Sequence, residues 1–131
     1  MNVTNVRAGL KTRLATISGL RVWDSIPDQV TPPGAVVGQL DFTFDIDNAR
    51  GLDIANCDIY VIVQRFDARS SQNQLDDYLG SGAKSIKTAI EADRTLGGAV
   101  NTLRVTRAEA GTYLQGDVTF LSYRFSLTIW G

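Results

Sequence analysis

The chain has 131 residues, of which 44% are hydrophobic and 21% charged, and its 13 basic and 14 acidic residues leave a net charge of −1. These values are typical of one globular domain over residues 1–131, with no electrostatic reason to seek nucleic acid or an anionic membrane. One cysteine and no histidine exclude an internal disulfide, a cysteine-based zinc site and any Ser-His-Asp or Cys-His catalytic arrangement.

The N-terminal segment has the spacing of an amphipathic helix, which we expect from about Asn5 to Ser18. Its apolar positions recur three or four residues apart: Val6, Leu10, Leu14 and Ile17. Thr4 or Asn5 can accept hydrogen bonds from the first-turn amides, and Gly19 can adopt the left-handed conformation that ends a helix.

Strand patterns follow this helix. Leu20–Trp23 is predicted as a short strand, and the prolines of residues 24–33 then favour a fixed loop, because proline cannot donate to a ladder. Ala35–Val37 begins the next strand. In its continuation, apolar residues alternate with polar ones, which predicts one apolar and one wet face: Leu40, Phe42, Phe44 and Ile46 against Asp41, Thr43, Asp45 and Asp47.

Residues 47–51 are predicted as a turn, and Ile54–Phe66 as a long strand that completes a hairpin with a charged tip. We call residues 40–54 the arm. Two interpretations stay open: the arm packs on its own core, or it lies on another chain.

The middle of the chain predicts two short helices with a glycine break at Gly80 and Gly82. Leu75, Tyr78 and Leu79 face inward from the first, and Ile86, Ala89 and Ile90 from the second. Val100–Ala108 returns to strand, Gly111–Asp117 is a bend or a hairpin turn, and the last strand runs to Trp130.

The predicted order is therefore α-β-β-β-α-α-β-β. It indicates an α+β fold, with an antiparallel or mixed sheet and helices packed on one side. The expected core comprises Leu10, Leu14, Ile17, Val61, Val63, Leu75, Leu79, Ile86, Ile90, Leu103, Val105, Phe125 and Leu127.

The residues that could carry chemistry do not form a recognisable site. A calcium-binding loop that begins at Asp45 needs glycine at its sixth position and glutamate at its twelfth, where the chain has Arg50 and Asn56. The Gly80–Gly82 segment lacks the Gly-Lys-Ser/Thr ending of a phosphate loop. No pair of carboxylates is placed around one substrate atom, so we expect no catalytic residue, metal or cofactor.

Other partners are weakly supported. Arg65 and Arg69 flank Phe66, a combination that can bind single-stranded nucleic acid, but acidic residues outnumber basic ones overall. The N-terminus lacks the layout of a signal peptide, and no apolar run approaches the roughly 20 residues of a membrane helix. We therefore expect no membrane partner and assembly in a cytosol-like compartment.

An ordered set of segments resembles the tail-terminator, or tail-completion, proteins of phages with long non-contractile tails. The resemblance covers roughly four-fifths of the chain, and no single motif carries it. The segments are Leu20–Trp23, Pro27–Val30, Pro32–Val37, Arg50–Asp53, Asp67–Leu79, Ser85–Asp93, Leu96–Gly98 and the closing strand around Leu121, Phe125 and Trp130.

This resemblance implies a structural virion protein in the tail or neck, without enzymatic activity. Such proteins form a ring, usually a hexamer, at the head-proximal end of the tail. The ring ends polymerisation of the tail tube, contacts the tail-tube protein and the head connector, or stopper, and lets DNA pass through its lumen without sequence-specific binding. The alternatives are another neck or tail-tube component of the virion, or a small cellular binding module.

Within that expectation, we predict that the arm contacts a neighbouring subunit or the last tail-tube ring. Its alternating aromatic residues offer more apolar surface than a solvated hairpin needs, and its tip is charged. The predicted interface residues are Phe42, Phe44, Asp45, Ile46, Asp47 and Arg50.

Overall fold

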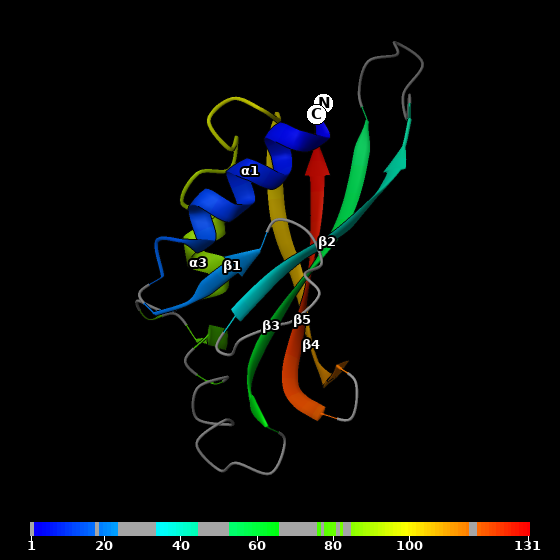
Figure 1. Cartoon of the computed structure of the whole chain (residues 1–131). Helices are drawn as coiled ribbons and strands as arrows, with labels where there is room; N and C mark the ends of the chain where they lie inside the picture. Colours follow the sequence, from blue (N-terminus) through cyan, green and yellow to red (C-terminus); the bar gives the residue numbers. More distant parts are fainter. Residues whose placement is uncertain are drawn as a thin grey trace.

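A computed structural model describes residues 2–17, 19–23, 34–44, 53–65, 76, 78–80, 82, 85–115 and 118–131. Its helices and strands follow one another along the chain as shown in Figure 1. They are α1 (Val3–Leu14), β1 (Arg21–Trp23), β2 (Gly34–Thr43), β3 (Ile54–Arg65), α3 (Ile86–Glu91), β4 (Thr102–Gln115) and β5 (Val118–Trp130).

The five strands form one sheet in the order β1-β2-β3-β5-β4. β1 pairs with β2 in parallel, and every other neighbouring pair is antiparallel, so the sheet is mixed. The α+β class is confirmed. The predicted order with two central helices is not confirmed, because most of the first helix lies outside the described residues, where only Asp76, Tyr78 and Leu79 are helical.

α1 begins and ends earlier than its apolar pattern predicts. Its N-cap is Asn2, whose side chain accepts a hydrogen bond from the Asn5 backbone N–H at 3.0 Å, so Thr4 and Asn5 are already helical. The helix ends at Leu14, with Ala15 as its C-cap donating to the Lys11 carbonyl, and Ile17 follows in a turn that keeps it on the buried face. Gly19 has a φ of 80°, the left-handed conformation predicted for it.

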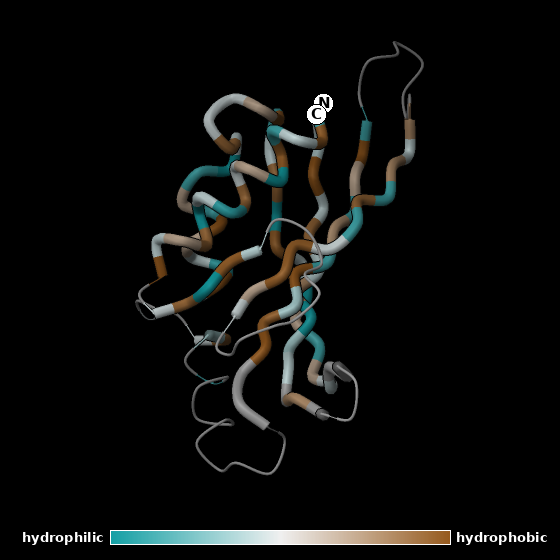
Figure 2. The backbone as a smooth tube through the Cα atoms, in the orientation of Figure 1, coloured by the Kyte–Doolittle hydropathy of each residue, from teal (hydrophilic) through white to brown (hydrophobic). Residues whose placement is uncertain are grey.

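The main core lies between the sheet and the two helices, which share one side of it (Figure 1). Figure 2 shows hydrophobic segments alternating with more polar ones along the strands, as a sheet with one packed face requires. Ten predicted core residues are buried: Leu10, Leu14, Ile17, Val61, Ile86, Ile90, Leu103, Val105, Phe125 and Leu127.

Three other core predictions have different outcomes. Leu79 is 37% exposed, so its predicted inward orientation is wrong; the neighbouring Tyr78 is the buried residue of that turn. Consecutive helical positions point about 100° apart, so both cannot face the core equally. Leu75 and the side chain of Val63 lie outside the described residues.

The opposite face of the sheet, here called the outer face, carries a second apolar cluster that the sequence did not predict. Val36 and Ile62 are fully buried there, and Phe120 is nearly so, with Trp23 and Tyr60 packed against them. The outer face is therefore apolar at one end and polar toward the other.

β4 is longer than predicted. The segment expected to bend from Gly111 to Asp117 instead stays in register with β5 as far as Gln115, which pairs with Val118. Gly111 pairs with Ser122, and its two sequence neighbours are also paired with β5. This continuous pairing outweighs the low strand propensity of glycine. Residues 116–117 lie outside the described part of the chain.

Each of three strands is interrupted by a β-bulge, and the one in β3 lies between Ile62 and Arg65. The register of β2 shifts between Val37 and Leu40, and that of β4 between Val105 and Arg107. An extra residue reverses the alternation of faces along a strand. Beyond the bulge in β4, Glu109 therefore lies on the outer face, opposite Arg124.

Candidate assembly surface

The described part of the arm presents two stacked phenylalanine rings. The Phe42 and Phe44 ring centroids lie 5.6 Å apart with an interplanar angle of 6°. They are two residues apart in extended chain, so both point to the helix side of the sheet. The other predicted interface residues, Asp45, Ile46, Asp47 and Arg50, lie outside the described residues.

The two rings are in different environments. Phe42 is half-buried and packs against the main core, as the own-core interpretation of the arm requires. Phe44 is 68% exposed and is the most exposed large apolar side chain among the described residues. The arm thus combines an anchored ring with a ring left open to solvent.

Phe44 follows a stretch of β2 with an open edge. β1 pairs only with Gly34–Val36, so within the described chain no strand pairs with the outer edge of β2 from Val37 to Thr43. At the bulge, the Arg7 guanidinium of α1 donates to the Gln39 side chain at 3.2 Å. Unpaired backbone groups on such an edge are available to another chain.

β4 forms the other edge of the sheet, and its first part is blocked by side chains of α3. The Glu91 carboxylate accepts a hydrogen bond from the Val105 N–H at 3.3 Å, and the Lys87 ammonium donates to the Val105 carbonyl at 3.4 Å. Lys87 also pairs with Glu91. These two side chains satisfy the outward backbone groups that a further strand would otherwise use.

The environment of Glu91 holds its carboxylate ionised. Burial alone would raise its pKa, but the hydrogen bonds from Lys87 and Val105 and the charges of Lys87 and Arg94 outweigh burial, so the pKa is lowered. The block on the edge at Val105 is therefore charged at neutral pH.

Beyond the bulge, the edge of β4 is open. From Arg107 to Thr112, no strand or helix of the described residues pairs with its outer side. Two small side chains on the helix side, Ala108 and Ala110, are exposed there, opposite Phe125 and Tyr123 of β5. This part of the edge is both unpaired and lightly covered.

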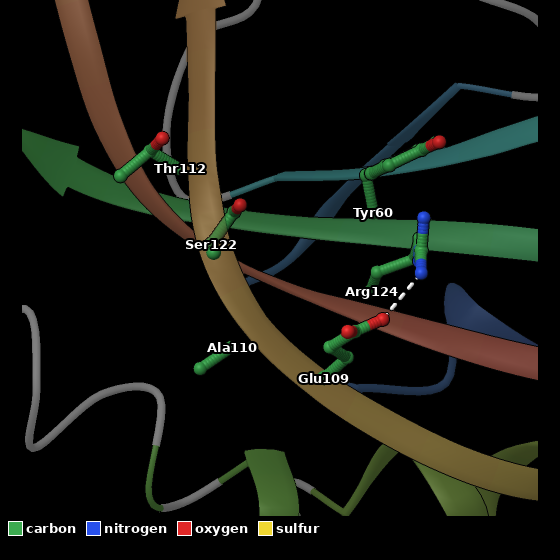
Figure 3. A pocket seen from close by; sticks show the side chains of 7 residues that line it. Tyr60, Glu109, Ala110, Thr112, Ser122 and Arg124 are labelled. Atoms are coloured by element: carbon green, nitrogen blue, oxygen red, sulfur yellow. Dashed lines mark hydrogen bonds and ion pairs between the residues drawn. The ribbon is translucent and has the colours of Figure 1, made fainter.

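A notch of about 210 Å³ lies on the outer face beside this open edge. Its lining includes the cross-strand pair Gly111 and Ser122, whose small side chains leave this space between the larger groups of Tyr60 and Arg124. Figure 3 shows Arg124 reaching Glu109 across the notch wall, next to Tyr60.

The charges around the notch do not cancel. Glu109 forms ion pairs with both Arg124 and Arg107, so two cations share one carboxylate. The hydrogen bond and the charge of Glu109 raise the pKa of Arg124 above its usual range. Ser122 is only 4% exposed, and its hydroxyl has no side-chain hydrogen bond within the described part of the chain. A small anionic group is the complementary occupant.

The only cysteine is a core residue. Cys57 is 2% exposed, and burial, followed by the charge of Asp58, raises its thiol pKa to about 12. A nucleophilic cysteine needs a depressed pKa, so this environment suppresses thiolate chemistry.

The described residues contain neither a metal-binding cluster nor a membrane-spanning helix. No three His, Cys, Asp or Glu side chains of these segments gather in a way that could hold a metal ion. None of the described helices has the length and apolarity needed to span a membrane.

Sequence reasoning found the aromatic pair but missed the notch. Arg107, Glu109 and Arg124 are not among the site residues predicted from the sequence. The alternation along β5 places Ser122 and Arg124 on one face, but nothing in the sequence places the bulge that brings Glu109 to that face.

Comparison with known proteins gave no match: no protein-family model and no curated protein resembles the chain closely enough to be recognised.

Proposed function

We propose that the chain is a structural virion protein that forms a ring at the head-proximal end of a phage tail. In this role it ends polymerisation of the tail tube and joins the tail to the head connector. The ring is homo-hexameric, as in the family that the sequence resembles, and DNA crosses its lumen without sequence-specific contacts. No catalysis, cofactor or membrane is involved.

The observation that carries the proposal is Phe44, 68% exposed beside an unpaired stretch of β2. An isolated domain gains nothing from an exposed aromatic ring beside open backbone groups, whereas an assembly protein can bury both on a neighbour. The ordered resemblance of the sequence supplies the kind of assembly.

The charge distribution supports a passive role toward DNA. On the outer face, Arg107 and Arg124 both pair with Glu109, which offsets part of their charge. A tight DNA-binding surface needs many uncompensated cations against the phosphates. A face with few of them lets DNA slide past.

Imaging of particles of the phage that encodes the chain tests this proposal. A specific antibody fragment should label one ring where the tail meets the head, and deletion of the gene should give overlong, headless tails. Label along the whole tail would identify a tail-tube component instead. Absence of the protein from particles, and of head and tail genes beside its own, would favour a cellular binding module.

A further inference from the structure

The two open stretches of sheet edge differ in position along the strands. β2 is open toward its end, from Val37 to Thr43, whereas β4 is open beyond its bulge, from Arg107 onward. The closed stretches are opposite to these: β1 covers the start of β2, and Lys87 and Glu91 cover Val105. β2 and β4 therefore each have an available segment, and the two segments lie diagonally across the sheet.

We propose that Leu40–Phe44 of one copy of this chain adds as an antiparallel strand to Ala108–Thr112 of the next copy. If neighbouring subunits are related by rotation about an axis roughly parallel to the strands, each strand has the same direction in both subunits. β2 and β4 run in opposite directions within the sheet, so the neighbour's β4 meets β2 antiparallel. The contact is head-to-tail, the type that generates rings.

The helix-side faces of the two segments are complementary in size. Setting Phe44 opposite the neighbour's Ala108 places Phe42 opposite Ala110, because antiparallel partners have a constant sum of positions. The exposed alanines leave room for both rings. The half-buried Tyr123 of β5 is the cross-strand partner of Ala110. In this register the exposed face of Phe44 is covered.

The outer faces are complementary in charge. The same register places Asp41 opposite Gly111 at the notch. Asp41 is exposed and forms no ion pair with another described residue, so its carboxylate is available. Gly111 has no heavy atom within 4 Å of a side-chain position, which leaves space for the Asp41 side chain to lean toward Arg124 and the buried Ser122 hydroxyl.

The charges disfavour two-fold contacts centred on Asp41 or Arg107. A β2–β2 pairing centred on Asp41 would set the carboxylates of two copies against each other, and a β4–β4 pairing centred on Arg107 would do the same for two guanidiniums. Like charges directly across strands are destabilising. The inference deepens the proposed function and rests on it only for closure of the ring.

Cysteine trapping tests the pairing with purified protein. The proposed register sets Thr43 beside the neighbour's Glu109 on the outer face. Thr43→Cys and Glu109→Cys proteins, mixed and mildly oxidised, should give a disulfide-linked dimer, while each variant alone should give none. Cys57 can stay in place because it is buried, and wild-type protein provides the background. Arg104→Cys replaces Glu109→Cys in the control, because Arg104 lies in the blocked part of the same edge.

A second measurement does not depend on a disulfide. In sedimentation at rising concentration, Asp41→Arg and Gly111→Val should each raise the dissociation constant by about tenfold or more, since each removes one half of the notch contact. Gly82→Val is the matched control, because Gly82 also has open space around it but lies outside both edges.

Three results would overturn the strand addition: equal dimer yield from either cysteine variant alone, trapping through Arg104 as efficient as through Glu109, or no mixed dimer at the highest concentration that the protein tolerates. A failed trap with the protein present at the neck would remove this contact and leave the proposed function. A successful trap with the protein absent from particles would support this contact and contradict the proposed function.

Discussion

Gly38 lies where the neighbouring backbone leaves no room for a side chain. A Cβ atom at this bulge position would lie 2.8 Å from the Asp58 carbonyl oxygen, a distance that real Cβ atoms do not show, and 3.4 Å from the Tyr60 ring. Glycine is therefore required here by the close approach of β3, and an added methyl group must displace backbone.

We expect Gly38→Ala to lower the free energy of unfolding by about 1–3 kcal/mol, the usual cost of overpacking. Gly111→Ala is the control, because the same methyl group at Gly111 meets open space in another strand. Urea titration of both variants provides the measurement. Equal midpoints for the two variants would show that the bulge is not at Gly38.

Cys57 makes alkaline stability depend on one thiol. Its pKa is raised from 9.0 to about 12 in the folded chain, so the folded state keeps its proton while the unfolded state loses it. The stabilisation is complete below about pH 9 and is lost as pH rises toward 12, at up to about 1.4 kcal/mol per pH unit.

The prediction for Cys57 compares wild-type protein with Cys57→Ala, because the difference between the two isolates the contribution of this thiol. Between pH 9 and 11, wild-type stability should fall more steeply than that of Cys57→Ala, as measured by urea titration at each pH. In the native protein a thiol reagent should react with Cys57 only after unfolding. Rapid reaction of the folded protein, or parallel pH curves, would place the thiol at the surface.

At the scale of elements, Glu91 links α3 to the edge of β4. Its side chain is 12% exposed and accepts from the Val105 N–H, and its pKa is lowered in the folded chain. A depressed carboxyl pKa stabilises the fold above the unfolded value of about 4.5, and the stabilisation is lost as pH falls through the folded pKa.

Glu91→Gln keeps an acceptor for Val105 but removes the charge that pairs with Lys87 and Arg94. We expect it to destabilise the fold by about 1–2 kcal/mol at pH 7, typical of hydrogen bonds to charged groups. The deficit should shrink as pH falls below 4.5. Thermal unfolding from pH 7 to pH 3 measures it, and a deficit that stays constant over this range would mean that the ion pairs contribute nothing.

The alternation of apolar residues predicted most elements because burial on one face leaves a period in the sequence. The stripe of α1 and the faces of β5 are of this kind: Leu10, Leu14, Phe125 and Leu127 are all buried as predicted. Boundaries were less predictable. The start of α1 is set by the side-chain cap at Asn2, and the length of β4 by cross-strand pairing through Gly111. Neither feature produces a periodic spacing of apolar residues in the sequence.

The candidate surface was predicted only in part for the same reason. Phe42 and Phe44 stand out because they alternate with polar residues. The notch depends on register: a bulge between Val105 and Arg107 moves Glu109 to the face of Arg124. A one-residue shift reverses every later side chain, and no residue type near the bulge specifies that shift.

At the scale of the whole molecule, the two phenylalanines separate folding from assembly. Phe42 packs on the core, whereas Phe44 is mostly exposed. Phe44→Ser should therefore change monomer stability by no more than about 0.5 kcal/mol, as for other exposed sites. If a neighbour buries the ring, the same change should weaken each subunit contact by about 1.5–3 kcal/mol.

Chemical denaturation and sedimentation, performed on the same preparations, measure these two quantities. In the phage, Phe44→Ser should produce overlong or headless tails from a folded protein. Phe42→Ser is the comparison variant, because it should lower monomer stability as well. Unfolding caused by Phe44→Ser alone would assign the ring to the subunit's own core, and normal tails would leave the exposed ring without a role.

The diagonal placement of the two open edge segments has a geometric consequence for any closed assembly. A neighbour that pairs the later part of its β4 with the later part of β2 is displaced along the strand direction by a fixed amount. Around a circle these displacements add up, and they cancel only if the strands are inclined to the ring axis, as in a barrel with non-zero shear. Subunits with strands parallel to the axis would climb into an open helix, so the inclination of the sheet decides whether the assembly ends or continues.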